Sequence, residues 1–114
     1  MIHILLHFAV PLAVALVFYR PSWRSAALIM AGTMLVDADH LLANPIYDPD
    51  RCSIGFHPLH SGIAIVGYML LFLVPVVVTR MRGTPGLAGK ARVLQLVGSG
   101  LVLHMALDAI DCRF

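Results

Sequence analysis

The sequence predicts an all-α protein, specifically an integral-membrane four-helix bundle with both termini extracytoplasmic. Of its 114 residues, 60% are hydrophobic and only 12% are charged, and the mean hydropathy is +0.88. Soluble domains carry about 25% charged residues, so this composition is typical of a membrane protein. Four long apolar stretches, none of which reads as a strand, use nearly the whole chain. They predict a single transmembrane domain over residues 1–114.

The four stretches have the length of membrane spans. A helix that rises about 1.5 Å per residue needs about 20 residues to cross the hydrocarbon core. The first stretch lacks a basic start and a clear cleavage site, so we interpret it as a retained helix rather than a secretory signal. Pro21 suits the start of the second span and Pro58 the first turn of the third. The expected spans are about 2–19, 23–42, 59–79 and 91–110. Glycines expected to allow close helix contact are Gly62, Gly67, Gly98 and Gly100.

Charge placement predicts the orientation of these spans. Six of the eight basic residues lie in the connections at 19–25 and 79–92. By the positive-inside rule, that end faces the cytoplasm. The termini and the 43–58 loop then face outward, together with all six acids and all six histidines. We therefore expect a polar site at the extracytoplasmic end.

The spacing of these polar residues indicates a metal site. Side chains three or four residues apart share a helix face, and such pairs are His3 with His7, Asp37 with His40, His57 with His60, His104 with Asp108, and Asp108 with Asp111. An aspartate at mid-bilayer costs about 2.5 to 3.5 kcal/mol, so it normally faces a bundle interior and marks function. Metal cations would neutralise the clustered acids. Imidazole and carboxylate ligands favour zinc, with manganese or iron as alternatives, and the number of candidate ligands suggests two or three ions.

The acids of the second span do not share one face of a regular helix. Asp39 lies about 200° around an α-helix from Asp37, at about 100° per residue. We expect that the helix unwinds there or that Asp39 binds a different ion. In the outer loop, Arg51 is the only basic residue, so it is a candidate phosphate contact or a solvated side chain. Cys52 and Cys112 suit either a disulfide, which we favour, or two thiolate ligands.

Three motifs resemble a known family. "VDADH" at 36–40, "HPLHS" at 57–61 and "HMALDAID" at 104–111 are similar to motifs of the membrane-bound metal-dependent hydrolases, which are distantly like zinc-dependent phospholipase C. The whole chain more narrowly resembles a small family of four-span bacterial inner-membrane proteins. This resemblance implies a multi-pass protein of the bacterial inner membrane with its site facing the periplasm. The metal roles that it implies fall on His7, Asp37, Asp39, His40, His60, His104 and Asp108.

The sequence departs from the family motifs at three positions. Val36 replaces a proline, His57 is only three residues before His60, and Asp111 stands where the family often has threonine. We therefore expect His57 and Asp111 to act as catalytic acid or base, or to support the ligands. His3 remains a candidate ligand from its pairing with His7.

The first function predicted is a metal-dependent hydrolase of phosphoesters, with lipid or lipid-linked substrates at the outer membrane–water interface. The alternative is a divalent-metal-binding or transport protein, which the apolar inner halves of the spans disfavour. A third class is a haem-carrying electron-transfer bundle. For this class two axial histidines deep in the bilayer would be enough, and a cluster of acidic residues would not help. Membrane lipid is the expected partner, and no nucleic acid is expected. The sequence is compatible with either a monomer or a homo-oligomer.

Overall fold

The chain is all-helical in the computed structural model, which describes residues 2–42, 44, 52, 54–83, 86 and 89–113, without the side chains of Ile2, His3, His40 and Arg113. Four α-helices and three 3-10 helices follow one another: α1 (Ile2–Phe18), η1 (Arg20–Ser22), α2 (Trp23–Gly32), η2 (Thr33–Leu42), η3 (Pro58–His60), α3 (Gly62–Met81) and α4 (Gly89–Arg113). No strand occurs among these described residues. The predicted all-α class is confirmed.

The second and third expected spans differ from the helices observed. The second, 23–42, divides into α2 and the 3-10 helix η2. The third starts later than expected, because Pro58 begins the separate turn η3. Ser61 then has an extended backbone (φ −74°, ψ 161°), and its side chain accepts a hydrogen bond from the Ala64 N–H. Such an N-cap satisfies a free backbone donor and starts a new helix, so α3 begins at Gly62.

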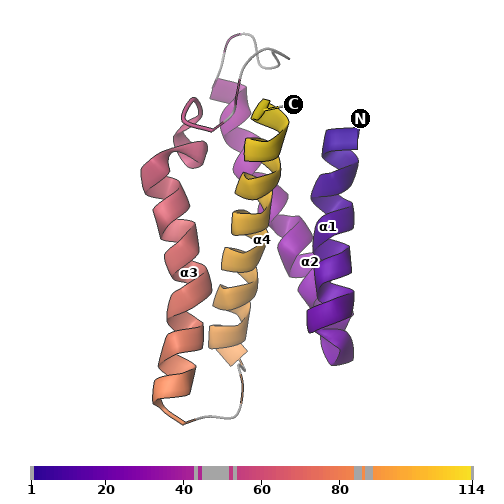
Figure 1. Cartoon of the computed structure of the whole chain (residues 1–114), viewed down its shortest axis with the longest axis vertical. Coiled ribbons are helices and arrows are strands. Elements are labelled where there is room, and N and C mark those ends of the chain that lie inside the picture. The colour runs from indigo at the N-terminus through magenta and orange to yellow at the C-terminus, as the bar shows by residue number, and fades with distance from the viewer. Residues whose placement is uncertain are drawn as a thin grey trace.

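The helices form an elongated bundle with principal extents of 48 × 26 × 22 Å. Successive helices run in opposite directions, so both marked ends of the chain lie at the same end of the molecule (Figure 1). α4 is central and packs against α1, α2 and α3. α3 packs mainly against α4 and stands at the edge of the bundle (Figure 1). The residues of α4 are therefore the ones that can meet side chains from every other helix.

Two glycines allow α4 to approach its neighbours closely. A Cβ at Gly98 would lie 2.6 Å from the carbonyl carbon of Leu71 in α3, and a Cβ at Gly100 would lie 2.7 Å from Thr33 Oγ1 at the start of η2. The expected role of these glycines in helix contact is confirmed. It is wrong for Gly62 and Gly67, since a Cβ at either would meet nothing within 4 Å.

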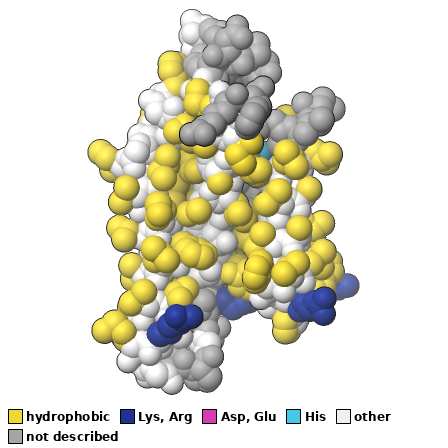
Figure 2. All heavy atoms as spheres, in the orientation of Figure 1, with side chains coloured by type: hydrophobic (Ala, Val, Ile, Leu, Met, Phe, Trp, Pro, Cys, Tyr) yellow, Lys and Arg dark blue, Asp and Glu magenta, His cyan; other side chains and the backbone are white. Residues whose placement is uncertain are grey.

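The outside of the bundle is strongly apolar. α3 and α4 are each long and apolar enough to cross a membrane, and none of the most hydropathic window of α3 is buried within the protein. Hydrophobic side chains cover the face of the molecule between its two ends (Figure 2). Large exposed apolar surfaces of this kind mark contact with a membrane or a partner. Among the described residues, α1 is a shorter apolar helix.

The described basic side chains gather at the end of the molecule away from the termini (Figure 2). This end is tied together by hydrogen bonds from Tyr19 Oη to Gln95 Oε1 at 2.7 Å, and from the Arg92 guanidinium to Ser22 Oγ. Both bonds join the α1–α2 turn to α4. The basic side chains in question are Arg20, Arg24, Arg80, Arg82, Lys90 and Arg92.

The glycine contacts generate a matched pair of substitutions. We expect Gly98→Ala to destabilise the bundle by about 1 to 3 kcal/mol, because the added methyl group meets the α3 backbone, which cannot move aside cheaply. Gly67→Ala places the same methyl group in open space on α3 and should be neutral or slightly stabilising. Unfolding of the purified protein in detergent measures both. Equal stability of the two variants would contradict the close α3–α4 contact.

Candidate metal centre

The motif "VDADH" lies on the unusual element η2. Ten consecutive residues, Thr33–Leu42, coil as a 3-10 helix, where runs beyond three or four residues are uncommon. With about three residues per turn, positions 37 and 39 lie about 120° apart around the axis. The helix tightens here, whereas the expectation was that it unwinds or that Asp39 binds a different ion. Asp37 and Asp39 both reach the imidazole of His60, one at each ring nitrogen.

Four side chains from three elements converge at the end of the bundle that carries the termini. Asp37 comes from η2, His60 from η3, and His104 and Asp108 from successive turns of α4. One ligand atom from each lies within 4.8 Å of all the others. The sequence predicted all four as metal ligands, and the structure brings them together.

The four atoms alternate between nitrogen and oxygen. His60 Nε2 lies 3.4 Å from Asp37 Oδ1 and 3.0 Å from Asp108 Oδ2. His104 Nε2 lies 3.0 Å from the same Asp37 oxygen and 3.2 Å from the same Asp108 oxygen. Each imidazole nitrogen thus faces two carboxylate oxygens, although it can carry only one hydrogen.

These distances suit ligands that share one cation. Ion-to-ligand distances of about 2.0 to 2.2 Å for nitrogen and oxygen imply neighbouring ligand atoms about 2.8 to 3.6 Å apart, for angles at the ion between about 90° and about 109°. The four nitrogen–oxygen distances fall in this range. The donor set, two imidazoles and two carboxylates, is also one that divalent transition metals accept. The residues present therefore fit a divalent metal ion.

The group is enclosed except at Asp37. His60, His104 and Asp108 are at most 4% exposed, whereas the side chain of Asp37 is 37% exposed. Buried carboxylates need a compensating positive charge, which either protonated imidazoles or a metal ion can provide. The opening at Asp37 is the side from which a ligand would reach the group.

His7 and Asp39 flank the group rather than belonging to it. His7 Nε2 donates to Asp108 Oδ1 at 3.1 Å, whereas His60 and His104 face the other oxygen, Oδ2. The His7 ring packs edge-on against His104 with centroids 4.4 Å apart. Asp39 is buried and contacts His60 Nδ1 at 3.0 Å. Both were predicted as metal ligands. The structure places each in contact with a member of the group.

His57 is buried beside the group. It is 3% exposed, and its ring centroid lies 5.7 Å from that of His60. The His57 ring also packs edge-on against Phe56, with centroids 5.0 Å apart. This predicted catalytic residue therefore stands next to a candidate ligand, within the outer segment that carries both histidines.

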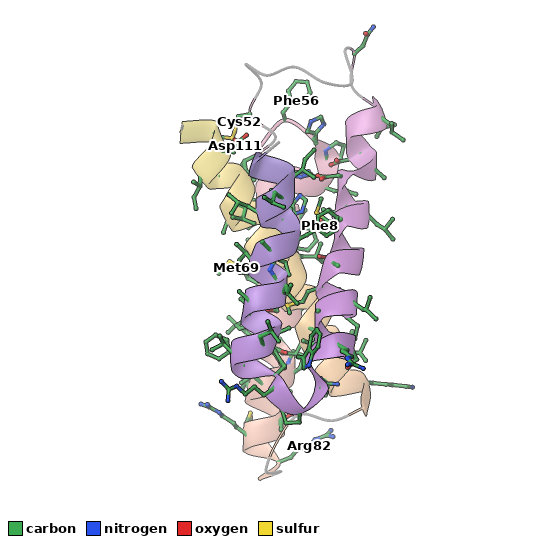
Figure 3. The ribbon with its side chains drawn as sticks, turned by 90° about the vertical axis from the view of Figure 1, so that its right-hand side faces the viewer. Phe8, Cys52, Phe56, Met69, Arg82 and Asp111 are labelled. Carbon is green, nitrogen blue, oxygen red and sulfur yellow. A yellow bond between two sulfur atoms is a disulfide. The ribbon has the colours of Figure 1, made fainter. Side chains whose placement is uncertain are left out.

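Asp111 lies one turn beyond Asp108 near the end of α4 and is exposed. It neighbours Cys112, which forms a disulfide with Cys52 (Figure 3). The favoured disulfide is thereby confirmed over a pair of thiolate ligands. The bond ties the outer loop to the last turn of α4. Other predicted site residues lie outside the described part of the structure, namely the side chains of His3 and His40, and all of Arg51.

The sequence analysis did not single out Tyr68 or the backbone of Leu59. Tyr68 Oη donates to the Leu59 carbonyl oxygen at 2.7 Å, and the Leu59 N–H donates to Asp39 Oδ2 at 2.8 Å. Together they fasten η3, and with it His60, to α3 and η2. A tyrosine inside an otherwise apolar span was the available signal, because a buried or membrane-facing hydroxyl usually has a partner.

Residues 1–114 match a protein family described as a family of unknown function (DUF6122). No curated protein and no solved structure matches the chain. The match spans every residue, but the family description names no activity. The chemistry of the site is therefore inferred from the geometry of its residues.

The four-residue group generates a prediction about metal content. We expect the purified protein to contain a divalent metal ion, and expect His104→Ala and Asp37→Ala each to lose it, because each removes one of the converging ligand atoms. Elemental analysis by mass spectrometry measures the ion per chain, and the visible spectrum excludes haem. Gln95→Ala is the control, since it changes a buried polar residue of α4 away from the group. Variants that keep their metal would contradict the ligand assignment.

Proposed function

The chain belongs to the DUF6122 family, and we propose that it is a metal-dependent membrane hydrolase that cleaves phosphoester bonds in lipid or lipid-linked substrates. The observation that carries the proposal is the alternation of two imidazole nitrogens and two carboxylate oxygens at 3.0 to 3.4 Å in a buried group. The resemblance of the three motifs to membrane-bound hydrolases supports the same class.

We place the protein in the bacterial inner membrane with four spans. α3 and α4 have the required length and hydropathy. α1 has 17 residues, or about 26 Å at 1.5 Å per residue. Ten residues of α2 and ten of η2 together reach about 35 Å, because a 3-10 helix rises about 2.0 Å per residue. Both lengths are near the hydrocarbon thickness of about 30 Å.

The orientation follows from the charges. The described Lys and Arg side chains lie at the end of the bundle away from the candidate metal centre (Figure 2). Basic residues favour the cytoplasmic side of a membrane. The candidate metal centre would then face the periplasm, where an oxidising environment also accommodates the Cys52–Cys112 disulfide.

A divalent ion bound to Asp37, His60, His104 and Asp108 would lower the pKa of a coordinated water and stabilise negative charge on a phosphoryl group. Zinc is favoured by the nitrogen and oxygen ligands, and manganese or iron also suits them. The four-residue group accounts for one ion. Further ions, up to the two or three expected, would be bound with the help of His3, His7 and His40.

Three other residues complete the proposed machinery. His57, buried beside His60, would accept a proton from the attacking water or give one to the leaving group. Asp111, exposed one turn beyond Asp108, would assist the same proton transfer. Arg51, in the outer loop, would bind the substrate phosphate through its guanidinium group.

The surroundings of the group support an amphiphilic substrate. Large exposed apolar side chains lie next in sequence to the predicted site residues or close to them: Phe8 follows His7, Leu59 precedes His60, and Leu41 lies four residues after Asp37. A purely water-soluble phosphoester would gain nothing from these side chains. A lipid would place its acyl chains against them while its headgroup reaches the ligands.

The alternative function is divalent-metal binding or transport without hydrolysis. The inner half of the bundle, expected to be apolar, does contain buried polar side chains at Thr33, Gln95 and Ser99. This corrects the expectation and favours the alternative. However, a cluster of apolar side chains lies among these residues, each at most 1% exposed, and would obstruct an ion path. The cluster consists of Ala15, Ala26, Met30 and Leu96.

Hydrolysis is tested with phospholipid and generic phosphoester panels. We expect turnover that disappears with a chelator and returns when zinc or manganese is added. His104→Ala and Asp37→Ala should be inactive, while Gln95→Ala keeps activity because it does not contact the group. A wild-type protein that holds its metal but hydrolyses no substrate in either panel would favour the binding alternative.

His57 is tested separately from the ligands. We expect His57→Gln to retain its metal and lose activity by about 10²- to 10⁴-fold, the usual contribution of a general acid or base. The pH profile of kcat should lose the corresponding limb. Metal content and kcat measured on the same preparation distinguish the possible roles, since a simultaneous loss of metal would make His57 a ligand instead.

A further inference from the structure

Asp39 makes two hydrogen bonds through the same oxygen. Its Oδ2 accepts from His60 Nδ1 at 3.0 Å and from the Leu59 N–H at 2.8 Å. The residue is 4% exposed, and it comes from η2, while both donors belong to η3. Asp39 therefore holds the backbone and the ring of the segment that delivers His60 to the metal centre.

The first bond decides which nitrogen of His60 is available. A carboxylate can only accept, so the hydrogen of a neutral imidazole lies on Nδ1. The lone pair is then on Nε2, which is the nitrogen that faces Asp37 Oδ1 and Asp108 Oδ2. Histidine ligands in metal sites are commonly oriented by a carboxylate in this way.

Asp37 and Asp39 consequently have different relations to the same ring. Asp37 faces the Nε2 side of His60 and belongs to the four-residue group. Asp39 faces the Nδ1 side and lies outside that group. The tight coil of η2 produces this division, because it sets the two carboxylates about 120° apart.

We propose that Asp39 is a positioning residue that fixes the orientation and tautomer of His60 for metal binding, and is not itself a ligand. This inference rests on the metal centre of the proposed function. The two acids of the "DAD" sequence then have different roles. Asp37 supplies a ligand atom, and Asp39 orients the His60 ring so that its Nε2 is available as a ligand.

The test measures zinc affinity, zinc stoichiometry and the tautomer of His60. Zinc binding to the purified protein is followed by competition with a chelating dye, and ¹⁵N shifts of labelled histidine report the tautomer. We expect Asp39→Ala to bind the wild-type number of zinc ions at saturation, with affinity lower by about 10- to 100-fold. We expect Asp39→Asn to lose less, because its amide oxygen can still accept from Nδ1.

Tyr68→Phe is the matched control. It removes the other side-chain bond to Leu59, the one to the carbonyl oxygen, without touching His60. We expect a smaller loss of zinc affinity than in Asp39→Ala, because the bond from Asp39 to the His60 ring remains, and an unchanged His60 tautomer. Asp37→Ala, which removes a ligand, should lower the stoichiometry itself.

Three results would overturn the inference. An Asp39→Ala protein that binds fewer zinc ions at saturation would make Asp39 a ligand. Unchanged affinity in Asp39→Ala, or equal losses in Asp39→Ala and Tyr68→Phe, would remove the specific role of the Asp39–His60 bond. If Asp39→Ala does not fold, Asp39→Asn decides through the same readouts.

The failure of the proposed function would look different. A wild type that binds zinc but hydrolyses nothing rejects the hydrolase and leaves the Asp39 result standing. If the wild type binds no zinc, the tautomer of His60 in the metal-free protein still decides. A hydrogen on Nδ1 in the wild type, together with a changed ratio of the two tautomers in Asp39→Ala, supports the positioning bond. The same ratio of tautomers in both proteins rejects it.

Discussion

The structure depends on how negative charge is accommodated inside an apolar bundle. Asp108 is buried and Asp37 is partly buried, in a protein whose surface is strongly apolar. Isolated carboxylates in such surroundings are costly, because they lose hydration and gain nothing in return. Here each carboxylate oxygen of the group lies between two imidazole nitrogens. A cation held by all four ligand atoms would offset the charge of both acids.

The packing of α4 makes this arrangement possible. Gly100 lies one turn before His104, and at Gly100 the helix closely approaches the side chain of Thr33 and the Cα of Met30. At Gly98 it approaches the backbone of α3 in the same way. These contacts bring α4 close to η2 and α3 just inside the level of the ligands. The short distances at the centre follow from small residues one to two turns away.

The segment that carries His57 and His60 is held in place by connections of different kinds. The Cys52–Cys112 disulfide is covalent, the Tyr68 hydroxyl binds the Leu59 carbonyl, and Asp39 binds the Leu59 N–H and the His60 ring. A short 3-10 turn has little stability of its own, so a ligand placed on it needs such support. His57 and His60 thus come from a segment that is preorganised by its neighbours, which is what a catalytic or metal-binding side chain requires.

The sequence by itself determined the helical class, the apolar surface, the separation of basic from acidic and histidine residues, and the pair of His104 and Asp108 on one helix face. These properties are local, since hydropathy and the spacing of four residues act between neighbours along the chain. Only the tertiary structure decided that Asp37 and Asp39 approach opposite nitrogens of one ring, and that Gly98 and Gly100 but not Gly62 and Gly67 lie at helix contacts. These features depend on helix pitch and on distances between segments 20 to 70 residues apart in the chain, which no local pattern encodes.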